Sequence, residues 1–314
     1  MTLFLSEQDV ASLVEMREVV PAVEECFRRQ ASGTAVNSPR TRASTPGAVL
    51  NVMHAVLPYL GRAGIKCYLS SGKGTRFVFV LFRLEDAEPL AVMGADILGR
   101  YRTGAASAVA TKHLFGVRDF DFAICGAGRQ ALTQVRALGE VASLKSVRVW
   151  SPHGERRESL AKELRDLGFA ASASASLADA LSGAEVATAI TSSKEPFLTP
   201  ELVRSVRHLN LCGSNSPLRA EASPECVAEF QTVVVDDLLQ AKVEAGDLVG
   251  TEKKGLFSWD RAIELKDIVG GKVRPRGRTL FKSNGVAIED VATASLVYDR
   301  ALERGGYAER SLGF

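Results

Sequence analysis

A short glycine-rich segment has the residue types and the spacing of a dinucleotide-binding loop. In DFAICGAGRQA, Gly126, Gly128 and Ala131 form the pattern G-x-G-x-x-A between an apolar run and an amphipathic one. Gly126 permits a tight turn, Gly128 lets a pyrophosphate approach the backbone, and Ala131 allows a helix to pack closely on a strand. The unpaired N–H groups at the start of that helix favour phosphate. The predicted dinucleotide contacts in this loop are Gly126, Ala127, Gly128, Arg129 and Gln130.

The end of the next predicted strand bears on the choice between NAD and NADP. An acidic residue there would bind the adenosine ribose hydroxyls, but SVRVW is followed by Ser151. Arg156 and Arg157 come shortly afterwards, and arginine binds phosphate through paired hydrogen bonds. We therefore favour NADP(H), contacted by Ser151 and Arg156, and keep NAD(H) as the alternative. Arg157 fits a solvent-exposed helix face better than a phosphate contact.

The elements around this loop alternate between strand and helix. Strands are predicted at 121–125, 146–150, 185–190, 208–213 and 232–237, and helices at 126–142, 155–168 and 199–206. This alternation predicts a parallel sheet covered by helices on both faces, as in an α/β Rossmann domain. Thr191 and Gly213 stand at the ends of two of these strands, the edge where a cofactor binds, so both are added to the predicted cofactor contacts.

The first third of the chain follows a different pattern. A helix is predicted over residues 6–31, capped by Ser6. Four β-rich runs follow at 49–56, 64–70, 76–82 and 89–95, with a hairpin turn at 84–88. Neighbouring strands without intervening helices predict a mostly antiparallel sheet. A helix over 96–115 ends at Gly116, and a last helix over 287–306 is expected to pack back on this part of the chain.

Composition excludes several other classes. The 314 residues suggest two domains, and 39 basic against 37 acidic residues leave a net charge of only +2. That balance predicts neither a nucleic-acid nor a membrane partner, and the basic run 272–278 is expected to be a solvated loop. No metal site is predicted, because no Cys or His pair has ligand spacing. Five scattered cysteines, no signal peptide and no apolar run of membrane-spanning length indicate a cytoplasmic protein.

Motifs in order along nearly the whole chain resemble the ornithine cyclodeaminase/mu-crystallin family. They are PRTR (39–42), VMHAV (52–56), IK (65–66), YRTGAASA (101–108), GAGRQA (126–131), VRVWS (147–151), GSNSPLRAE (213–221), EAGDL (244–248) and FKSNGVAIED (281–290). The resemblance implies a Rossmann NAD(P)-binding domain at 119–286. That domain would be inserted into an α+β substrate-binding and dimerisation domain made of 1–118 and 287–314. It also implies a homodimer acting on a small amino or imino acid.

The resemblance also places the active-site residues. The substrate-carboxylate arginine falls on Arg40, which we expect in a loop, with Arg42 as a near rival. The active-site lysine falls on Lys66, although a lysine in a strand more often faces solvent. Arg102 would bind both the substrate carboxylate and the cofactor phosphate. Thr103 and Lys282 complete the implied cofactor contacts.

Two departures from the family pattern concern the substrate. Asn51 and Asn215 stand where ornithine cyclodeaminases carry a glutamate and a catalytic aspartate. An amide binds substrate through hydrogen bonds, but it neither takes a proton at neutral pH nor balances an ammonium group. His54, in place of the family's proline, is expected to be a partly buried packing residue.

These observations favour an oxidoreductase that reduces the imine of a small 2-oxo acid, as a ketimine reductase or an amino-acid dehydrogenase does. Arg40, Lys66 and Arg102 would be its catalytic residues, with Asn51 and Asn215 in the substrate site. Ornithine cyclodeamination to proline and ammonia, a lyase reaction, is the first alternative. A non-catalytic protein that binds NADP(H) or a small ligand is the second.

Overall fold

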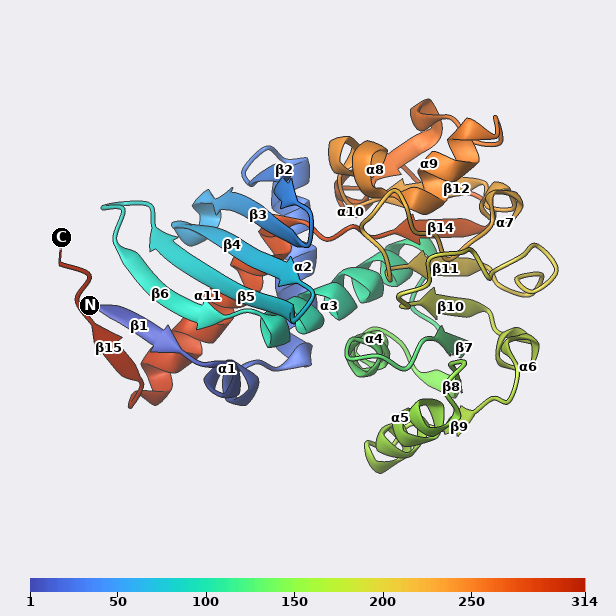
Figure 1. Cartoon of the computed structure of the whole chain (residues 1–314), viewed down its shortest axis with the longest axis horizontal. Coiled ribbons are helices and arrows are strands. Elements are labelled where there is room, and N and C mark those ends of the chain that lie inside the picture. Colours follow the sequence, from blue (N-terminus) through green and yellow to red (C-terminus); the bar gives the residue numbers. More distant parts are fainter. Residues whose placement is uncertain (314) are drawn as a thin grey trace. The chain divides into compact units, whose positions relative to one another are not determined.

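The computed structural model describes residues 1–313 and divides into two compact units (Figure 1). Unit 1 consists of Met1–Arg102 together with the chain from Val286 onward, and unit 2 is Thr103–Gly285. The first boundary lies inside helix α3 (Asp96–Leu114), whereas the sequence placed it after that helix, at residue 118. As predicted, α3 is one helix, and Gly116 follows it with a φ of 99°.

Unit 1 is built on a seven-stranded sheet in the order β15-β1-β6-β5-β4-β3-β2. Its strands are β1 (Thr2–Leu5), β2 (Val36–Thr45), β3 (Ala48–Leu57), β4 (Arg62–Ser71), β5 (Gly74–Arg83), β6 (Pro89–Gly94) and β15 (Ala308–Arg310). Strands β3 to β6 pair antiparallel in sequence order, which confirms the predicted meander, and β2, which was not predicted, pairs antiparallel with β3. The turn between β5 and β6 closes through a bond from Arg83 N to Glu88 O of 2.9 Å.

Three helices complete unit 1: α1 (Glu7–Leu13), α2 (Met16–Ala31) and α11 (Ala287–Arg304). Ser6 caps α1 as predicted, but the single helix expected over 6–31 is broken at Val14, whose backbone is extended at φ −87° and ψ 130°. The last helix packs against β2–β5 and α2, as expected, and Figure 1 shows it crossing the sheet beside α2. One sheet face is therefore covered by helices.

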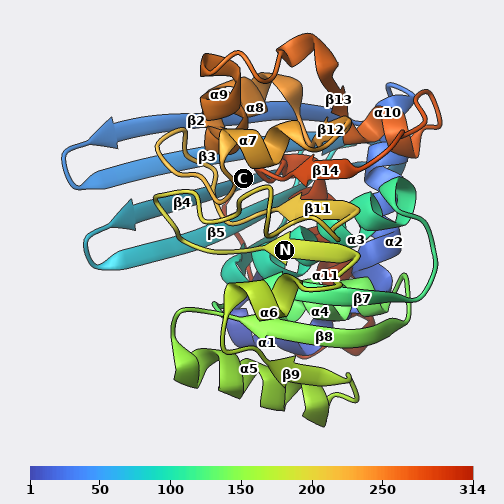
Figure 2. The same ribbon diagram turned by 90° about the vertical axis from the view of Figure 1, so that its right-hand side faces the viewer.

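Unit 2 holds an eight-stranded sheet in the order β13-β12-β14-β11-β10-β7-β8-β9. The strands are β7 (Phe120–Cys125), β8 (Leu144–Trp150), β9 (Ala171–Ala173), β10 (Val186–Ala189), β11 (His208–Leu211), β12 (Thr232–Val235), β13 (Ala262–Glu264) and β14 (Thr279–Lys282). All pairs are parallel, and Figure 2 shows the strands running from β9 at one edge to β13 at the other. The chain runs from β7 to β8 on one side and resumes with β10 on the other, so β7 and β10 flank the switch point where α/β sheets bind ligands.

The helices of unit 2 are short. They are α4 (Ala131–Gly139), α5 (Gly154–Asp166), α6 (Leu177–Leu181), α7 (Pro224–Ala228), α8 (Leu238–Glu244), α9 (Gly246–Lys253) and α10 (Leu265–Val269). The prediction of a helix over 199–206 is wrong, because this segment forms turns. The hydrogen bond from Val203 N to Thr199 O spans four residues, as in a helix, but the one from Val206 N to Val203 O spans only three. Within residues 1–313, the structure holds no helix long and apolar enough to cross a membrane.

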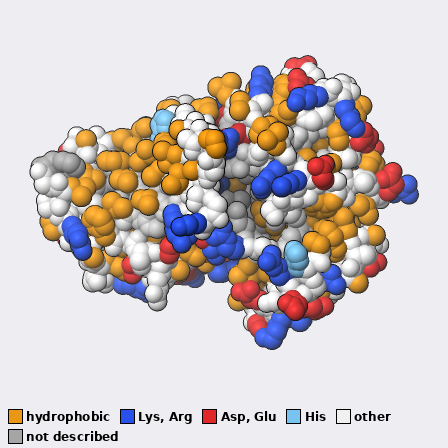
Figure 3. All heavy atoms as spheres, viewed as in Figure 1, with side chains coloured by type: hydrophobic (Ala, Val, Ile, Leu, Met, Phe, Trp, Pro, Cys, Tyr) orange, Lys and Arg blue, Asp and Glu red, His pale blue; other side chains and the backbone are white. Residues whose placement is uncertain are grey.

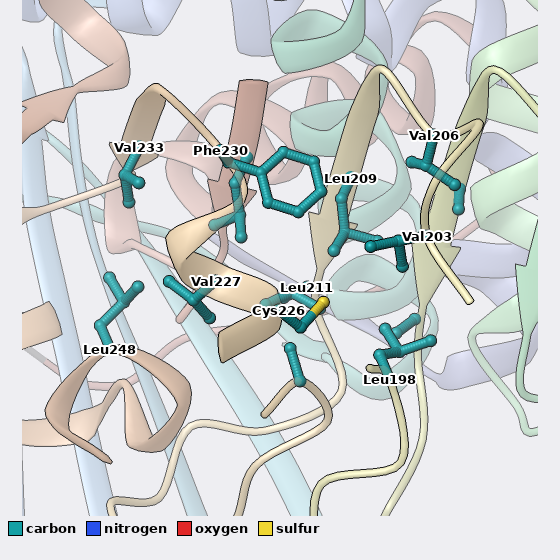
Figure 4. Packing of buried hydrophobic residues seen from close by; sticks show 14 of the residues in the cluster. Leu198, Val203, Val206, Leu209, Leu211, Cys226, Val227, Phe230, Val233 and Leu248 are labelled. Carbon is teal, nitrogen blue, oxygen red and sulfur yellow. The ribbon is translucent and has the colours of Figure 1, made fainter. Parts of the chain in front are cut away.

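An apolar cluster on one face of the parallel sheet fixes unit 2 (Figure 4). Leu209 and Leu211 of β11 pack with Cys226 and Val227 of α7 and with Phe230. Because side chains alternate along a strand, the intervening residues of HLNL point to the opposite face. The buried turn segment before β11 adds Val203 and Val206 to the same cluster, so packing fixes this segment without a helix.

Candidate active site

A buried ion-pair cluster in unit 1 contains the lysine that the sequence singled out. Lys66 lies on β4, on the face that also carries buried Met53 and Phe79, and its exposure is 2%. Its Nζ donates to both carboxylate oxygens of Asp290, on α11, at 2.7 Å each. Lys66 is therefore buried and does not face solvent, as a lysine in a strand usually does.

Arg102 joins the same cluster from the end of unit 1 in α3. Its Nε donates to Asp290 Oδ1 at 3.1 Å and its Nη1 to Glu289 Oε2 at 2.9 Å, and all three side chains are buried. Thr103, the next residue, is also buried. Consecutive acids at the start of α11 thus bind two cations that stand far apart in the sequence.

Arg40 approaches this cluster from a strand and not from the expected loop. It lies within β2, where the pairing with β3 shifts between Ser38 and Thr41. A bulge of this kind re-aims side chains, and Arg40 is 9% exposed whereas its rival Arg42 is exposed. The position of Arg40 therefore suits a buried carboxylate better than that of Arg42.

The electrostatics of the cluster act on the lysine. The pKa of Lys66 is lowered from 10.5 to about 8, chiefly by burial and also by the charges of Arg102 and Arg40, while Asp290 opposes them. A lysine with this pKa is still protonated at neutral pH and can exchange a proton close to it. Glu289 and Asp290 are the carboxylates that pair with Lys66 and Arg102 in this cluster.

Asn51 lies beside an arginine. Its Oδ1 accepts a bond of 2.9 Å from Arg42 Nε, and its Nδ2 donates to Val49 O at 3.3 Å. His54, expected to be partly buried, is exposed, because it lies on the sheet face that no helix covers. Asn215 belongs to unit 2, in an exposed loop after β11.

The glycine loop of unit 2 has the geometry that phosphate binding requires. Gly126 adopts a φ of 122°, and a Cβ there would lie 2.4 Å from Ile190 O, so only glycine fits. A Cβ on Gly128 would meet nothing within 4 Å, which leaves open space beside the backbone. Helix α4 begins only at Ala131, later than predicted, and the Gln130 side chain does not cap it. The Ala131 N–H donates to Gly128 O at 3.0 Å, and the next N–H groups of α4 are donors of the kind that favour a phosphate.

The tip of β8 carries polar groups and no acid. Ser151 is buried, and its hydroxyl accepts from His153 N at 3.3 Å. Arg157 Nη1 donates to Ser151 O at 3.1 Å, so this arginine lies at the strand tip and not on a remote helix face. Arg156 is exposed.

Thr191 and Gly213 are joined by a side chain that the sequence analysis did not select. Glu221 Oε1 accepts from Thr191 N at 2.7 Å and from Thr191 Oγ1 at 2.8 Å, and its Oε2 accepts from Gly213 N at 2.8 Å. Lys282, predicted to contact cofactor, is fully buried and lies 2.9 Å from Asp247 Oδ2. We expect Lys282 to hold the end of β11 in place through its contacts with Asp247 and Ser214 O.

Four carboxylates of these clusters were not predicted from the sequence: Asp247, Glu221, Glu289 and Asp290. Each lay inside a motif quoted for the family resemblance, but none was given a role. Asp290 stands 224 residues from Lys66, so local spacing carried no trace of the pair. Among residues 1–313, no group of three or more His, Cys, Asp or Glu side chains could hold a metal ion.

Comparison with known proteins places the chain among amino-acid and imino-acid enzymes. The model of the ornithine cyclodeaminase/mu-crystallin family matches residues 1–305. An alanine dehydrogenase from Archaeoglobus fulgidus is 33% identical, over 96% of this chain and 96% of that protein. A Delta(1)-pyrroline-2-carboxylate reductase from Bacillus cereus is 30% identical, over 96% of this chain and 98% of that protein.

Solved structures agree in fold over almost the full length. Delta(1)-pyrroline-2-carboxylate reductase from Thermococcus litoralis, in complex with NADH and L-proline, superposes with a TM-score of 0.91 at 29% identity, over 98% of this chain and all of that chain. An archaeal alanine dehydrogenase dimer with bound NAD gives 0.90 at 29% identity, over 99% of both chains.

Proposed function

The chain belongs to the ornithine cyclodeaminase/mu-crystallin family, and on that premise we propose an NAD(P)-dependent oxidoreductase that reduces the imine of a small 2-oxo acid to an amino acid. Its relatives include enzymes that act on alanine and on pyrroline-2-carboxylate. The enzyme class is therefore an oxidoreductase acting on C=N and CH–NH₂ groups. The observation that carries the proposal is the buried Lys66, with its lowered pKa, held by Asp290 beside Arg102 and Arg40.

Each cation has a role in this reaction. Arg40 and Arg102 would bind the substrate carboxylate, because guanidinium groups match carboxylate oxygens in pairs. The Lys66 ammonium would give its proton to the imine nitrogen as the adjacent carbon gains the hydride's electron pair. Asp290 would keep Lys66 oriented, and Lys66 would regain its proton from solvent after the reaction. A reduced nicotinamide held by unit 2 would supply the hydride.

We further propose NADP(H) as the preferred cofactor. The tip of β8 offers Ser151, Arg156 and Arg157 to a 2′-phosphate and no carboxylate to a ribose hydroxyl. Arg157 Nε has no hydrogen-bond partner within the described residues, and it sits beside Ser151. Fluorescence titration should give a lower Kd for NADPH than for NADH, and Arg157→Ala should raise the NADPH value alone. Tighter binding of NADH would reverse the assignment.

Ornithine is a poor candidate substrate. The oxygen of Asn51, which replaces a family glutamate, accepts a hydrogen bond from Arg42. A distal ammonium group would therefore meet an amide and a guanidinium group, and both lack negative charge. The substrate side chain that fits is short or uncharged.

We also propose a homodimer in the cytoplasm. The uncovered sheet face of unit 1 exposes Leu50, Leu69 and Val78, and Figure 3 shows hydrophobic side chains gathered over β3–β5. A related alanine dehydrogenase is a dimer. All five cysteines are free, which fits a reducing compartment.

A panel of 2-oxo acids and amines, scored by oxidation of NADPH and NADH, tests the activity. We expect stoichiometric cofactor oxidation with small substrates and its loss in Arg102→Ala. Release of proline and ammonia from ornithine with catalytic NAD would instead indicate a cyclodeaminase. Binding of NADPH with no turnover of any substrate would indicate a non-catalytic binding protein.

A further inference from the structure

The Glu221 carboxylate lies at the centre of the edge where unit 2 would bind its dinucleotide. This side chain is fully buried, in the segment between β11 and α7. It receives three hydrogen bonds of 2.7 to 2.8 Å: two from Thr191, just beyond β10, and one from Gly213, just beyond β11. One carboxylate thus joins the ends of two neighbouring strands.

These contacts leave little space for other arrangements. A Cβ on Gly213 would lie 2.3 Å from Glu221 Oε1 and 2.3 Å from both Thr191 N and Thr191 O. The segment that ends in Thr191 also touches the glycine loop, since a Cβ on Gly126 would lie 2.4 Å from Ile190 O. A shift of Glu221 would therefore move Thr191 and Ile190, and with them the glycine loop that would hold the pyrophosphate.

A second layer of charges fixes Glu221 from behind. Its backbone N–H donates to Asp247 Oδ1 at 2.6 Å, and Asp247 Oδ2 lies 2.9 Å from Lys282 Nζ. Lys282 also donates to Ser214 O at 2.8 Å, which anchors the residue after Gly213. The Lys282 ammonium group is thus occupied by Asp247 and by Ser214 O. Glu221 is the side chain that contacts the ends of both β10 and β11.

We propose that Glu221 is a positioning residue for the dinucleotide, and that its ionised carboxylate sets Thr191 and Gly213 in the arrangement that binds cofactor. This inference rests on the proposed function, because it assumes that unit 2 binds NAD(P)(H). The three donors require a carboxylate with free lone pairs on both oxygens. A proton on Oε2 would face the N–H of Gly213 and release that strand end, whereas a proton on Oε1 would require the Thr191 hydroxyl to turn from donor to acceptor.

The charge environment makes this state sensitive to pH. Burial raises the pKa of Glu221 to about 7, Asp247 adds to the rise, and Lys282 and the bonds from Gly213 and Thr191 oppose it. Cys125 and Cys212 also lie close, but burial raises the pKa of both thiols, so they stay neutral. Because the carboxylate is ionised above about pH 7, cofactor binding should be tight there and weaken as the pH falls.

The test compares Glu221→Gln with Glu225→Gln, a matched control on α7 whose carboxylate is half exposed and pairs with Lys254. Kd for NADPH and NADH is measured by fluorescence from pH 6.5 to 8.5, with the melting temperature of each variant. At pH 8.5 we expect Glu221→Gln to raise Kd at least tenfold, and at pH 6.5 the difference should shrink to about threefold. The control should follow the wild type.

Kinetics add a readout that a purely structural role would not move. In Glu221→Gln the KM for cofactor should rise about tenfold, while kcat at saturating cofactor and the KM for substrate stay within about threefold. Unchanged cofactor binding, or an unchanged pH dependence, would overturn the proposal. If the wild type bound neither dinucleotide, the proposed function itself would fail.

Thr191→Val supplies an independent test if Glu221→Gln does not fold. It removes the hydroxyl donor at 2.8 Å and keeps the two backbone donors. Because that bond favours the ionised carboxylate, its loss should move the midpoint of the pH dependence upward. A midpoint that stays in place would contradict the role of Glu221.

Discussion

At the scale of single residues, the chemistry depends on how a buried ammonium group is balanced. Lys66 is surrounded by two arginines that disfavour its charge and by Asp290, which favours it. The balance leaves the group protonated at neutral pH but close to its pKa of about 8. A proton donor for an imine needs both properties: the proton must be present, and it must leave readily.

Removal of the Asp290 charge should therefore shift the pH profile of reduction. In the wild type, kcat/KM should fall as the pH rises through about 8, because Lys66 loses its proton there. Asp290 raises the pKa of Lys66, so in Asp290→Asn the alkaline limb should move to lower pH by roughly 1–2 units. Asp299→Asn, on the same helix but half exposed and paired with Arg62, should leave the limb in place. An unmoved limb in Asp290→Asn would show that the limb does not report Lys66.

These residues also show what the sequence can and cannot predict about a site. The types and motif context of Arg40, Lys66 and Arg102 were sufficient to select them. The predicted loop around Arg40 was wrong, because the polar sequence NSPRTR is typical of a loop and does not reveal a strand with a bulge. The roles of Asp290 and Glu221 were not predicted, because only the fold brings their partners close to them.

At the scale of elements, the turn between β7 and α4 contains two glycines, Gly126 and Gly128, with different roles. Gly126 is needed for the fold: it has a positive φ, and a side chain would collide with Ile190 O. Gly128 has open space around it, so a side chain there would not disturb the fold. That space is what a pyrophosphate would use.

Substitution of these two glycines should therefore separate stability from binding. Gly126→Ala should lower the free energy of unfolding by roughly 1–3 kcal/mol, because of the strained φ and the collision. Gly128→Val should leave the melting temperature near the wild-type value and raise Kd for NADPH at least tenfold. Thermal unfolding and fluorescence titration of both variants check this. Equal loss of stability in both would contradict the assignment.

A buried polar chain on the second face of the parallel sheet gives a second element-scale prediction. His208 Nδ1 lies 2.7 Å from Thr279 Oγ1, and Nε2 lies 3.1 Å from Asn210 Oδ1. Burial lowers the pKa of His208 from 6.5 to about 4, so the unfolded chain takes up this proton first as the pH falls. Stability should be complete above pH 6.5 and decline toward pH 4, by about 2 kcal/mol at pH 5 from this residue.

His208→Gln isolates this contribution, because glutamine does not titrate. Urea unfolding at pH 7.5 and pH 5 should show a smaller loss of stability in the variant than in the wild type. Equal losses would indicate that His208 is protonated in the folded protein.

Elements were predicted best where the pattern was long and periodic. The four-strand meander follows from alternating spacing and α11 from helical spacing, whereas α3 was predicted from its run of small residues and the glycine that ends it. The segment TPELVRSV had a good cap and a helical pattern, but packing of Val203 and Val206 into the sheet's core holds it in turns. Strand β14 lies in the middle of the parallel sheet, yet it was not predicted, because TLFK follows the basic run 272–278 and has only two apolar residues.

At the scale of the whole molecule, the sheet of unit 1 has two faces with different tasks. One face carries Lys66 and is covered by α11. On the other, Leu50 of β3 lies opposite Leu69 of β4, with 42% and 49% of their surfaces exposed. An antiparallel sheet usually presents polar residues to water on its second face. A contiguous apolar face is instead typical of a surface that binds another protein.

Leu69→Glu should therefore convert the proposed dimer into a monomer. A carboxylate on this face would lose its hydration on association, and only Arg76, opposite it on β5, would offset part of that cost, since its neighbour on β3 is Leu50. Sedimentation equilibrium at micromolar concentration should give one chain's mass for Leu69→Glu and twice that mass for the wild type. Leu167→Glu, at a leucine of similar exposure after α5 in unit 2, should remain dimeric. A dimeric Leu69→Glu would move the interface elsewhere. If it is monomeric but keeps its NADPH affinity, dinucleotide binding belongs to the single chain, and the dimer is not needed to form that site.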